Sequence, residues 1–294
     1  MKCAVCGRKA VLSSPSLCEF HLKVHMRKKV EEVLQRVKGI SEKRILIAVS
    51  GGKDSSSLAH ILKDFDFDKE MLHIDLGIPG YSERCLEAVK KLERDIRIKL
   101  NVVELAEYGF TIEDVQKAVE SNQLREKVCS ICGTVKRYIF NRFAWENGFD
   151  YVATAHNLDD VVALTAMGIS SGNISYPIEP VSHPIQHLKL AGKLKPFFHI
   201  GEREIMVYAL INGIPFYHGE CPYSTGNTQV IVKREITRLE AVLPNFGRNM
   251  VKIFRRIPRE PPALKSCTLC GYATSSGSGI CKFCRIQKSL ISQG

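Results

Sequence analysis

Residues 44–55 read RILIAVSGGKDS, an apolar run followed at once by a polar turn that contains two glycines. The run ILIAV is continuously apolar, as is typical of a strand buried on both faces of a parallel sheet. Adjacent glycines let the backbone approach a ligand closely, and amides near the start of a helix point at an anion. The turn is therefore predicted to cradle a phosphate, although it lacks the G-x-x-x-x-G-K-[ST] spacing of the common P-loop. Its residues are Ser50, Gly51, Gly52, Lys53, Asp54 and Ser55.

Around this stretch, short β-rich runs alternate with helical patterns. Strands are expected at residues 44–50, 71–76, 98–105 and 151–155, and helices near residues 54–64, 81–94, 111–126, 134–147 and 157–169. This order predicts an α/β fold with an open parallel sheet. Ligands bind such sheets beyond the carboxyl ends of the strands, so we expect the loops after Val49, Asp75 and Ala155 to converge on one crevice.

The chain has 11 cysteines, most of them in groups. Two groups are pairs of knuckles with the spacing of zinc ligands, and a closed set of four ligands makes a structural site without a bound water. Each site would stabilise a segment too small to build its own core. The predicted zinc ligands are Cys3, Cys6, Cys18 and His21, with His25 as an alternative to His21, and Cys267, Cys270, Cys281 and Cys284.

The basic residues gather at the two ends of the chain. Residues 1–44 hold 11 basic and 4 acidic residues, residues 45–232 hold 19 and 24, and residues 233–294 hold 12 and 3, which together give the formal charge of +11. An excess confined to the ends favours binding of a polyanion such as nucleic acid by those ends.

The same division predicts three domains. We expect a zinc module with a basic helix at residues 1–43, a catalytic domain at residues 44–256, and a zinc ribbon at residues 257–294 that begins with a proline-rich linker. No apolar run reaches the roughly 18 residues of a membrane helix, and the start Met1-Lys2-Cys3 lacks the apolar segment of a secretory signal. A cytoplasmic protein without a membrane partner is therefore expected.

Three further cysteines do not complete a tetrahedral set. Cys129 and Cys132 form a C-x-x-C pair, and Cys221 lies far downstream. Three thiolates on a [4Fe-4S] cluster leave one iron free to bind an exogenous group such as sulfide. The spacing alone leaves two other interpretations open, a Cys129–Cys132 disulfide with an unrelated Cys221, or three inert buried thiols.

The string SGGKDS after a buried strand resembles the PP-loop of the ATP pyrophosphatases, which adenylate a substrate oxygen and release pyrophosphate. Together with DLGIPGYSE, CSICGTVKR and HNLDD, it is similar to the TtuA and TtcA group of tRNA thiolation enzymes. Two flanking zinc modules favour the TtuA branch, which includes the archaeal and eukaryotic wobble-uridine thiolases.

This resemblance implies that the chain replaces O2 of a tRNA uridine by sulfur. It implies a PP-loop domain of the adenine nucleotide alpha hydrolase-like fold, and the cofactors ATP, Mg²⁺, two Zn²⁺ and a [4Fe-4S] cluster. The implied sulfur donor is a ubiquitin-like carrier protein or inorganic sulfide, and a homodimer is one possible assembly. The cluster ligands implied here are Cys129, Cys132 and Cys221.

Two more residues carry over from the motifs of the group. Lys136 would stabilise charge on the α-phosphate, and Asp160 would hold Mg²⁺ or orient the nucleoside. Asp54 would be a further ligand for Mg²⁺. Without the resemblance, Lys136 is equally well a solvated helix residue and Asp160 a helix cap. His156 is expected to shape the nucleotide pocket, with adenine near the loops of Asp75 and Ala155. Better-known members have glycine where this chain has Ala155.

Two other functions fit parts of the sequence. A PP-loop ligase that joins an amine to an adenylated base would leave the three cysteines without a role. A non-catalytic zinc-ribbon tRNA-binding protein would explain the basic ends alone. Which uridine is thiolated, T-loop or wobble, stays open, as does the choice between sulfide on the cluster and a cysteine persulfide.

Overall fold

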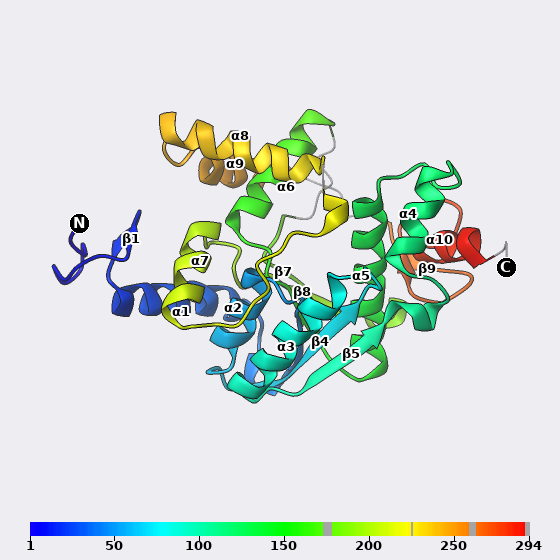
Figure 1. Cartoon of the computed structure of the whole chain (residues 1–294), viewed down its shortest axis with the longest axis horizontal. Coiled ribbons are helices and arrows are strands. Elements are labelled where there is room, and N and C mark those ends of the chain that lie inside the picture. Colours follow the sequence, from blue (N-terminus) through cyan, green and yellow to red (C-terminus); the bar gives the residue numbers. More distant parts are fainter. Residues whose placement is uncertain (173–177, 225, 259–262, 292–294) are drawn as a thin grey trace.

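The computed structural model describes residues 1–172, 178–224, 226–258 and 263–291. A twisted sheet and its covering helices form the centre of the molecule, and two small modules built from the two ends of the chain lie at opposite ends of its long axis (Figure 1). An α/β unit with cysteine-rich ligand sets near both ends of the chain agrees with the predicted fold class.

Six strands form the central sheet in the order β5-β4-β3-β6-β8-β7. They are β3 (Arg44–Ala48), β4 (Asp68–Asp75), β5 (Leu100–Glu104), β6 (Tyr151–Ala153), β7 (Val181–Ser182) and β8 (Gly192–Leu194). All neighbours pair in parallel except β7, which runs antiparallel to β8. The chain adds β4 and β5 on one side of β3 and then crosses to β6 on the other, so the strand order reverses between β3 and β6. A reversal of this kind is where open α/β sheets bind ligands.

Helices connect the parallel strands and cover both faces of the sheet (Figure 1). Those of the first two thirds of the chain are α1 (Glu19–Leu34), α2 (Lys53–Leu62), α3 (Ser82–Ile96), α4 (Ile112–Glu120), α5 (Val128–Glu146) and α6 (Leu158–Ser170). Short 3₁₀ turns lie at Ile40–Glu42, Leu105–Tyr108, Gln186–Leu188 and Pro222–Ser224. The four predicted strands and five predicted helices of the catalytic domain are all confirmed, with shifted bounds.

Strand β3 is apolar from Ile45 to Ala48 because both faces of the sheet are covered at these positions. Ile45 and Ile47 pack on one face of the sheet in a cluster with residues of α1, α2 and α3. Leu46 and Ala48 point to the other face and pack with Ala144 of α5. Because successive side chains alternate between two covered faces, every position from Ile45 to Ala48 is buried, and only Arg44 at the start of the strand is half-exposed.

The predicted start of one helix near residue 134 is wrong. Helix α5 begins at Val128, so the C-x-x-C pair lies in its first turns rather than in the loop before it. The residues Val128, Ile131, Val135 and Ile139 are all buried in one cluster and repeat at helical spacing. This periodicity would have extended the predicted helix towards residue 128, whereas the cysteine pair was expected just before the helix.

Several elements of the second half of the chain were not predicted. They are β7, β8, α7 (Glu202–Ile211), α8 (Thr228–Val242) and α9 (Phe246–Phe254). Helices α8 and α9 lie beside α6 at the edge of the molecule that is uppermost in Figure 1. None of the residues of α8 is buried, so this helix rests on the surface of the α/β unit.

Each terminal module is a small hairpin next to a helix. In the first, β1 (Leu12–Ser13) pairs with β2 (Ser16–Leu17) ahead of α1; in the second, β9 (Lys265–Ser266) pairs with β10 (Ala273–Thr274) ahead of α10 (Lys282–Ile291). Helix α10 packs on α4 and α5. Residues 259–262 of the predicted linker lie outside the described residues. Among the helices of the described ranges, none combines the length and apolar character that crossing a bilayer requires.

Candidate functional site

The glycine turn after β3 packs so closely on α3 that one of its positions, Gly51, has room only for glycine. Gly51 has a φ of 82°, and a Cβ atom there would lie 2.7 Å from the carbonyl oxygen of Cys85 on α3. The turn is closed by the Ser55 hydroxyl, which accepts from the Ser50 amide at 3.0 Å and donates to the Gly52 carbonyl at 3.1 Å. Helix α2 begins directly afterwards at Lys53, so its free amides face the space beyond β3.

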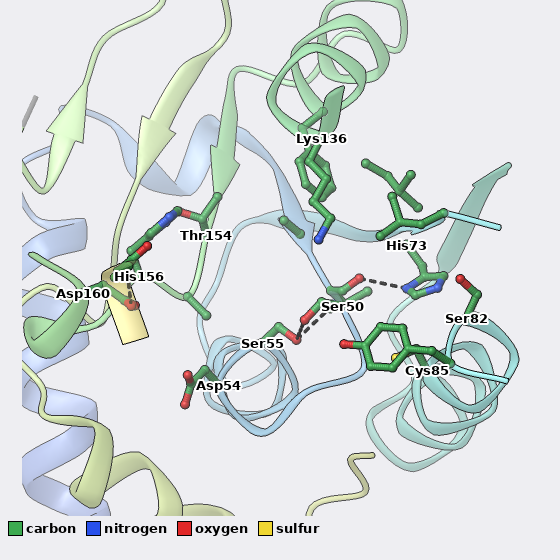
Figure 2. A pocket seen from close by; sticks show the side chains of 18 residues that line it. Ser50, Asp54, Ser55, His73, Ser82, Cys85, Lys136, Thr154, His156 and Asp160 are labelled. Carbon is green, nitrogen blue, oxygen red and sulfur yellow. Dashed lines mark hydrogen bonds between the residues drawn. The ribbon is translucent and has the colours of Figure 1, made fainter. Parts of the chain in front are cut away.

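A cavity of about 380 Å³ opens at the carboxyl ends of β3, β4 and β6, where the strand order reverses. The predicted crevice is therefore present. Figure 2 shows Lys136 pointing into it from α5, on the side opposite to Asp54 and Ser55. Its walls include Val49, Ser50, Asp54, Ser55, Ile74, Leu76, Lys136, Ala155, His156 and Asp160.

Some predicted site residues stand behind these walls. The Asp75 carboxylate accepts from the Gly77 amide at 2.9 Å, while its neighbours Ile74 and Leu76 line the cavity. Lys53 is not part of the cavity wall, and its ammonium forms an ion pair with Glu202. Asp75 therefore shapes the loop after β4 through its backbone turn.

Asp54 and Asp160, the two predicted magnesium ligands, are joined through one residue. The Asn157 side chain donates to Asp54 Oδ2 at 3.4 Å, and its backbone amide donates to Asp160 Oδ2 at 3.0 Å. Asp160 thereby caps helix α6 in a capping box with Asn157. The interpretation of Asp160 as a helix cap is thus correct, yet the same carboxylate also lines the cavity, so capping fixes its position there.

An ion-pair chain runs behind the two aspartates. The Lys53 ammonium lies 3.0 Å from Asp54 Oδ1 and 2.7 Å from Glu202 Oε1, and Lys233 of α8 lies 2.5 Å from Asp160 Oδ1 and 3.3 Å from Glu202 Oε2. Burial, together with the nearby Glu202 and Asp160 charges, raises the pKa of Asp54 although Lys53 opposes this. Oxygen ligands of this kind suit Mg²⁺.

The imidazoles of the cavity are neutral. Burial lowers the pKa of His156, whose Nδ1 lies 2.8 Å from the Thr154 hydroxyl. Burial also lowers the pKa of His73, whose Nδ1 lies 3.0 Å from the Val49 carbonyl and so carries the proton. Within the described residues, Nε2 of His73 is buried without a hydrogen-bond partner.

His73, Tyr81, Cys85 and Gln229 line the cavity but were not predicted as site residues. His73 lies near the end of β4, one of the strands expected to end at the crevice, and this position was a signal. Cys85 and Tyr81 lie at the start of α3 beside the glycine turn. Gln229 comes from α8, for which the sequence offered no signal.

Cys129, Cys132 and Cys221 lie near one another and near Lys136, although among the described residues only the two terminal sets bring their ligand atoms within 4.8 Å of one another. Cys129 and Cys132 lie on α5, and Cys221 precedes the 3₁₀ turn at Pro222–Ser224, which contacts α5. The Cys129 thiol donates to the Tyr223 carbonyl at 3.2 Å. Burial raises the pKa of Cys129 and of Cys221, whereas the nearby Lys136 lowers both. All three are free thiols, so no Cys129–Cys132 disulfide is present.

Both predicted terminal ligand sets are assembled. In each, the four ligand atoms lie within 4.8 Å of one another, and these are Cys3, Cys6, Cys18 and His21, and Cys267, Cys270, Cys281 and Cys284. His25 is not a ligand, because its Nε2 contacts Glu204 at 2.8 Å. Although burial opposes it, backbone amides including that of Cys281 lower the pKa of Cys267 to about 6. Soft ligands in a compact set of four fit a structural zinc ion.

Comparison with known proteins gives consistent matches over the chain. The PP-loop domain family matches residues 22–242. A tRNA-5-methyluridine(54) 2-sulfurtransferase from Pyrococcus horikoshii is 37% identical over 302 residues, which cover 97% of this chain and 93% of the relative. A protein of the same name from Thermotoga maritima is 35% identical over 306 residues, 99% of this chain and 97% of the relative.

Among solved structures, the U34-tRNA thiolase NcsA from Methanococcus maripaludis with its [4Fe-4S] cluster superposes with a TM-score of 0.81. The two chains are 24% identical, and the alignment covers 99% of this chain and 97% of the other. This likeness shows that the whole fold is shared, terminal modules included.

Proposed function

Because this chain belongs to the PP-loop family of tRNA 2-thiolation proteins, we propose that it replaces O2 of a tRNA uridine by sulfur in an ATP-dependent reaction. One observation carries the proposal. The cavity at the strand-order reversal brings the glycine turn, Lys136 and Asp160 together, while Cys129 and Cys132 lie on the same helix as Lys136 and Cys221 lies beside a turn that contacts this helix.

The phosphates of ATP would bind at the glycine turn. There the amides at the start of α2 and the close approach permitted by Gly51 favour an anion. Asp54 and Asp160, bridged by Asn157, would hold Mg²⁺ against the phosphate oxygens. Adenine would lie between the loops after β4 and β6, where His73 and His156 are neutral.

Lys136 would act on the reacting phosphate. Attack of the uridine O2 on the α-phosphorus forms an O–P bond and breaks the bond to the bridging oxygen, so pyrophosphate leaves. The Lys136 ammonium, which points into the cavity from α5, stabilises the charge that gathers on the phosphoryl oxygens (Figure 2). Sulfur then attacks C2, and O2 departs as part of AMP.

The three cysteines fit a [4Fe-4S] cluster. They are free, partly buried thiols from two adjacent segments, and thiolates are the soft ligands that iron–sulfur clusters take. A cluster held by Cys129, Cys132 and Cys221 would supply one open iron coordination position for the incoming sulfur. The sulfur would come from a ubiquitin-like carrier or from sulfide, and a persulfide on one of these cysteines is the competing form.

We propose 5-methyluridine 54 as the target, because the relatives of that name cover nearly the whole chain at 35% and 37% identity. The two terminal sets would hold zinc, and the basic modules around them would grip tRNA phosphates. The cytoplasm is the proposed location, since free thiols persist in a reducing compartment. A homodimer remains the proposed assembly.

Release of pyrophosphate and AMP by the anaerobically purified, iron-loaded protein tests this function. We expect both products to appear only when tRNA and sulfide are present together with ATP and Mg²⁺. Release with tRNA and an amine but without sulfide would favour a PP-loop ligase. No release at all would favour the non-catalytic tRNA-binding protein, and the proposed function would then be wrong.

A further inference from the structure

A carboxylate that the proposed reaction does not use occupies the centre of the ion-pair chain behind the cavity. Glu202, the first residue of α7, has one carboxylate oxygen 2.7 Å from the Lys53 ammonium and the other 3.3 Å from that of Lys233. Lys53 belongs to the glycine turn, whereas Lys233 comes from α8. A single anion therefore bridges two cations that lie 180 positions apart in the sequence.

Lys233 is a charged residue in a shielded place. Its side chain is 22% exposed and that of its partner Asp160 is 17% exposed. Its ammonium nevertheless has two carboxylate partners, Asp160 and Glu202, at ion-pair distance. A cation in such a position interacts more strongly with a bound anion than a surface lysine does.

The charges of the site explain why a second lysine is needed. Lys53 and Lys233 face Asp54, Asp160 and Glu202, which leaves an excess of one negative charge. ATP with one Mg²⁺ brings further negative charge into this site. Without Lys233 the excess would double, and the site would repel the nucleotide that it is built to bind.

Magnesium binding would free Lys233 from its present partner. If Asp160 holds Mg²⁺, its carboxylate would be shared with the metal and would attract the Lys233 ammonium less strongly, so the ammonium would need another anion nearby. The phosphates that arrive with the metal are that anion. Pyrophosphate has two phosphate groups, and Glu202 now provides two oxygens to the same two lysines.

We propose that Lys233 binds the pyrophosphate end of ATP together with Lys53, and that Glu202 holds both ammonium groups in place until the nucleotide arrives. This inference rests on the proposed ATP-dependent function. Helix α8 is then part of the nucleotide site although none of its residues is buried, and Gln229, whose amide donates to Asp160 at 3.2 Å, attaches the same helix.

The alternative role for Lys233 is structural: its ion pair with Asp160 would hold α8 against α6. The two roles differ in what they predict for ligands without a β-phosphate. If Lys233 binds phosphate, its loss lowers the affinity for ATP and pyrophosphate but not for AMP. If Lys233 only holds α8 against α6, its loss lowers the affinity for all three ligands alike. The two roles also predict opposite changes in pyrophosphate affinity when the Glu202 charge is removed. If Lys233 binds phosphate, removal of Glu202 frees the two lysines and strengthens binding. If Lys233 is structural, removal of Glu202 weakens the site.

Isothermal titration calorimetry of the zinc-loaded full chain with ATP, AMP and inorganic pyrophosphate distinguishes them. We expect Lys233→Met to weaken ATP and pyrophosphate binding about 10- to 100-fold, the size of a lost charge-assisted contact, with AMP binding unchanged. The matched control is Arg234→Met, which removes the same charge from the neighbouring, exposed position of α8 and should bind all three ligands normally. Glu202→Gln should bind metal-free pyrophosphate more tightly than the wild type.

Three results would overturn the inference. They are equal loss of AMP and ATP binding in Lys233→Met, identical behaviour of Lys233→Met and Arg234→Met, or weaker pyrophosphate binding by Glu202→Gln. A wild-type protein that binds neither ATP nor pyrophosphate would contradict the proposed function itself, and the inference with it. Circular dichroism and zinc content of each variant establish that the comparison is made between folded proteins.

Discussion

Replacing Gly51 with alanine tests the geometry of the phosphate turn. At a φ of 82° an alanine adopts the left-handed region, which costs about 1–2 kcal/mol. Its Cβ would also lie 2.7 Å from the Cys85 carbonyl oxygen and 2.8 Å from Cys85 Cα, both backbone atoms of α3. Forcing a methyl group into packed structure costs about 1–3 kcal/mol, so we expect a total loss of about 2–5 kcal/mol.

Gly52→Ala is the matched control in the same turn. Its φ of −84° is ordinary, and the nearest atom to a Cβ there is the Ser50 hydroxyl at 3.7 Å. We expect this variant to unfold at the wild-type urea concentration or slightly above it, because alanine restricts the unfolded chain by about 0.4–1 kcal/mol more than glycine. The single tryptophan, Trp145 on α5, reports unfolding by fluorescence.

The comparison is made on zinc-loaded protein, with ATP binding measured in parallel. We expect Gly51→Ala to lose both stability and ATP affinity, because relief of the contact must move the turn or α3. Equal urea midpoints for the two alanine variants would refute the reasoning about the turn.

Three further predictions follow from the site, the terminal modules and the buried histidines. Lys136→Met should slow AMP release about 100-fold or more while the Kd for ATP stays near the wild-type value, and a parallel loss of ATP binding would assign Lys136 to binding instead. Cys267→Ser should reduce the zinc content measured by atomic emission from two ions per chain to one, since the other ligand set lies at the far end of the molecule, and retention of two ions would contradict the assignment. Burial lowers the pKa of His60 and of His199 to about 4, below the value of about 6.5 in an unfolded chain, so the unfolded state binds more protons between these values. Stability should therefore fall as the pH drops from about 6.5 towards 4, and His60→Gln should reduce the loss seen in urea midpoints; a wild-type midpoint that is constant over this range would count against the neutral, buried histidines.

The parts of the fold that were predictable have strong local signals. Strand β3 is apolar from Ile45 to Ala48 because both of its faces are covered there, and the glycine turn after it is required by the close approach of Cys85. The terminal ligand sets follow from cysteine spacing alone, because knuckles a fixed distance apart can meet only around a small centre. Here local sequence and tertiary structure agree.

The parts that were missed depend on tertiary packing. Helix α8 buries no residue fully and packs on α6 through half-buried side chains such as Ile236, so its apolar face is narrow and gives only a weak periodic pattern. Strand β8 is the short run Gly192–Leu194, which contains a glycine and a lysine and becomes a strand through its pairing with β6. The meeting of Lys53, Glu202 and Lys233 follows from the packing of three separate helices, which spacing in a sequence does not encode.

The proposed chemistry combines features of both kinds. The glycine turn and the cysteine pair were found from sequence, whereas the arrangement that places them beside one cavity comes from the order of the strands. Lys136 and Cys132 lie on one helix, one turn apart, so the proposed phosphate-activating group and the proposed cluster ligand are held by the same element. In the proposed mechanism this arrangement would let adenylation and sulfur transfer take place at a single base.

Mass spectrometry of tRNA nucleosides tests the central claim most directly. The iron-loaded protein is incubated anaerobically with tRNA that lacks the 2-thio modification, together with ATP, Mg²⁺ and sulfide. The tRNA is then digested to nucleosides. We predict 2-thiolated 5-methyluridine in the wild-type reaction and none with Cys221→Ser or without ATP. If the wild-type protein binds iron and ATP but forms no 2-thiolated uridine, or if Cys221→Ser thiolates as well as the wild type, the claim that this cavity thiolates tRNA at a three-cysteine site is contradicted.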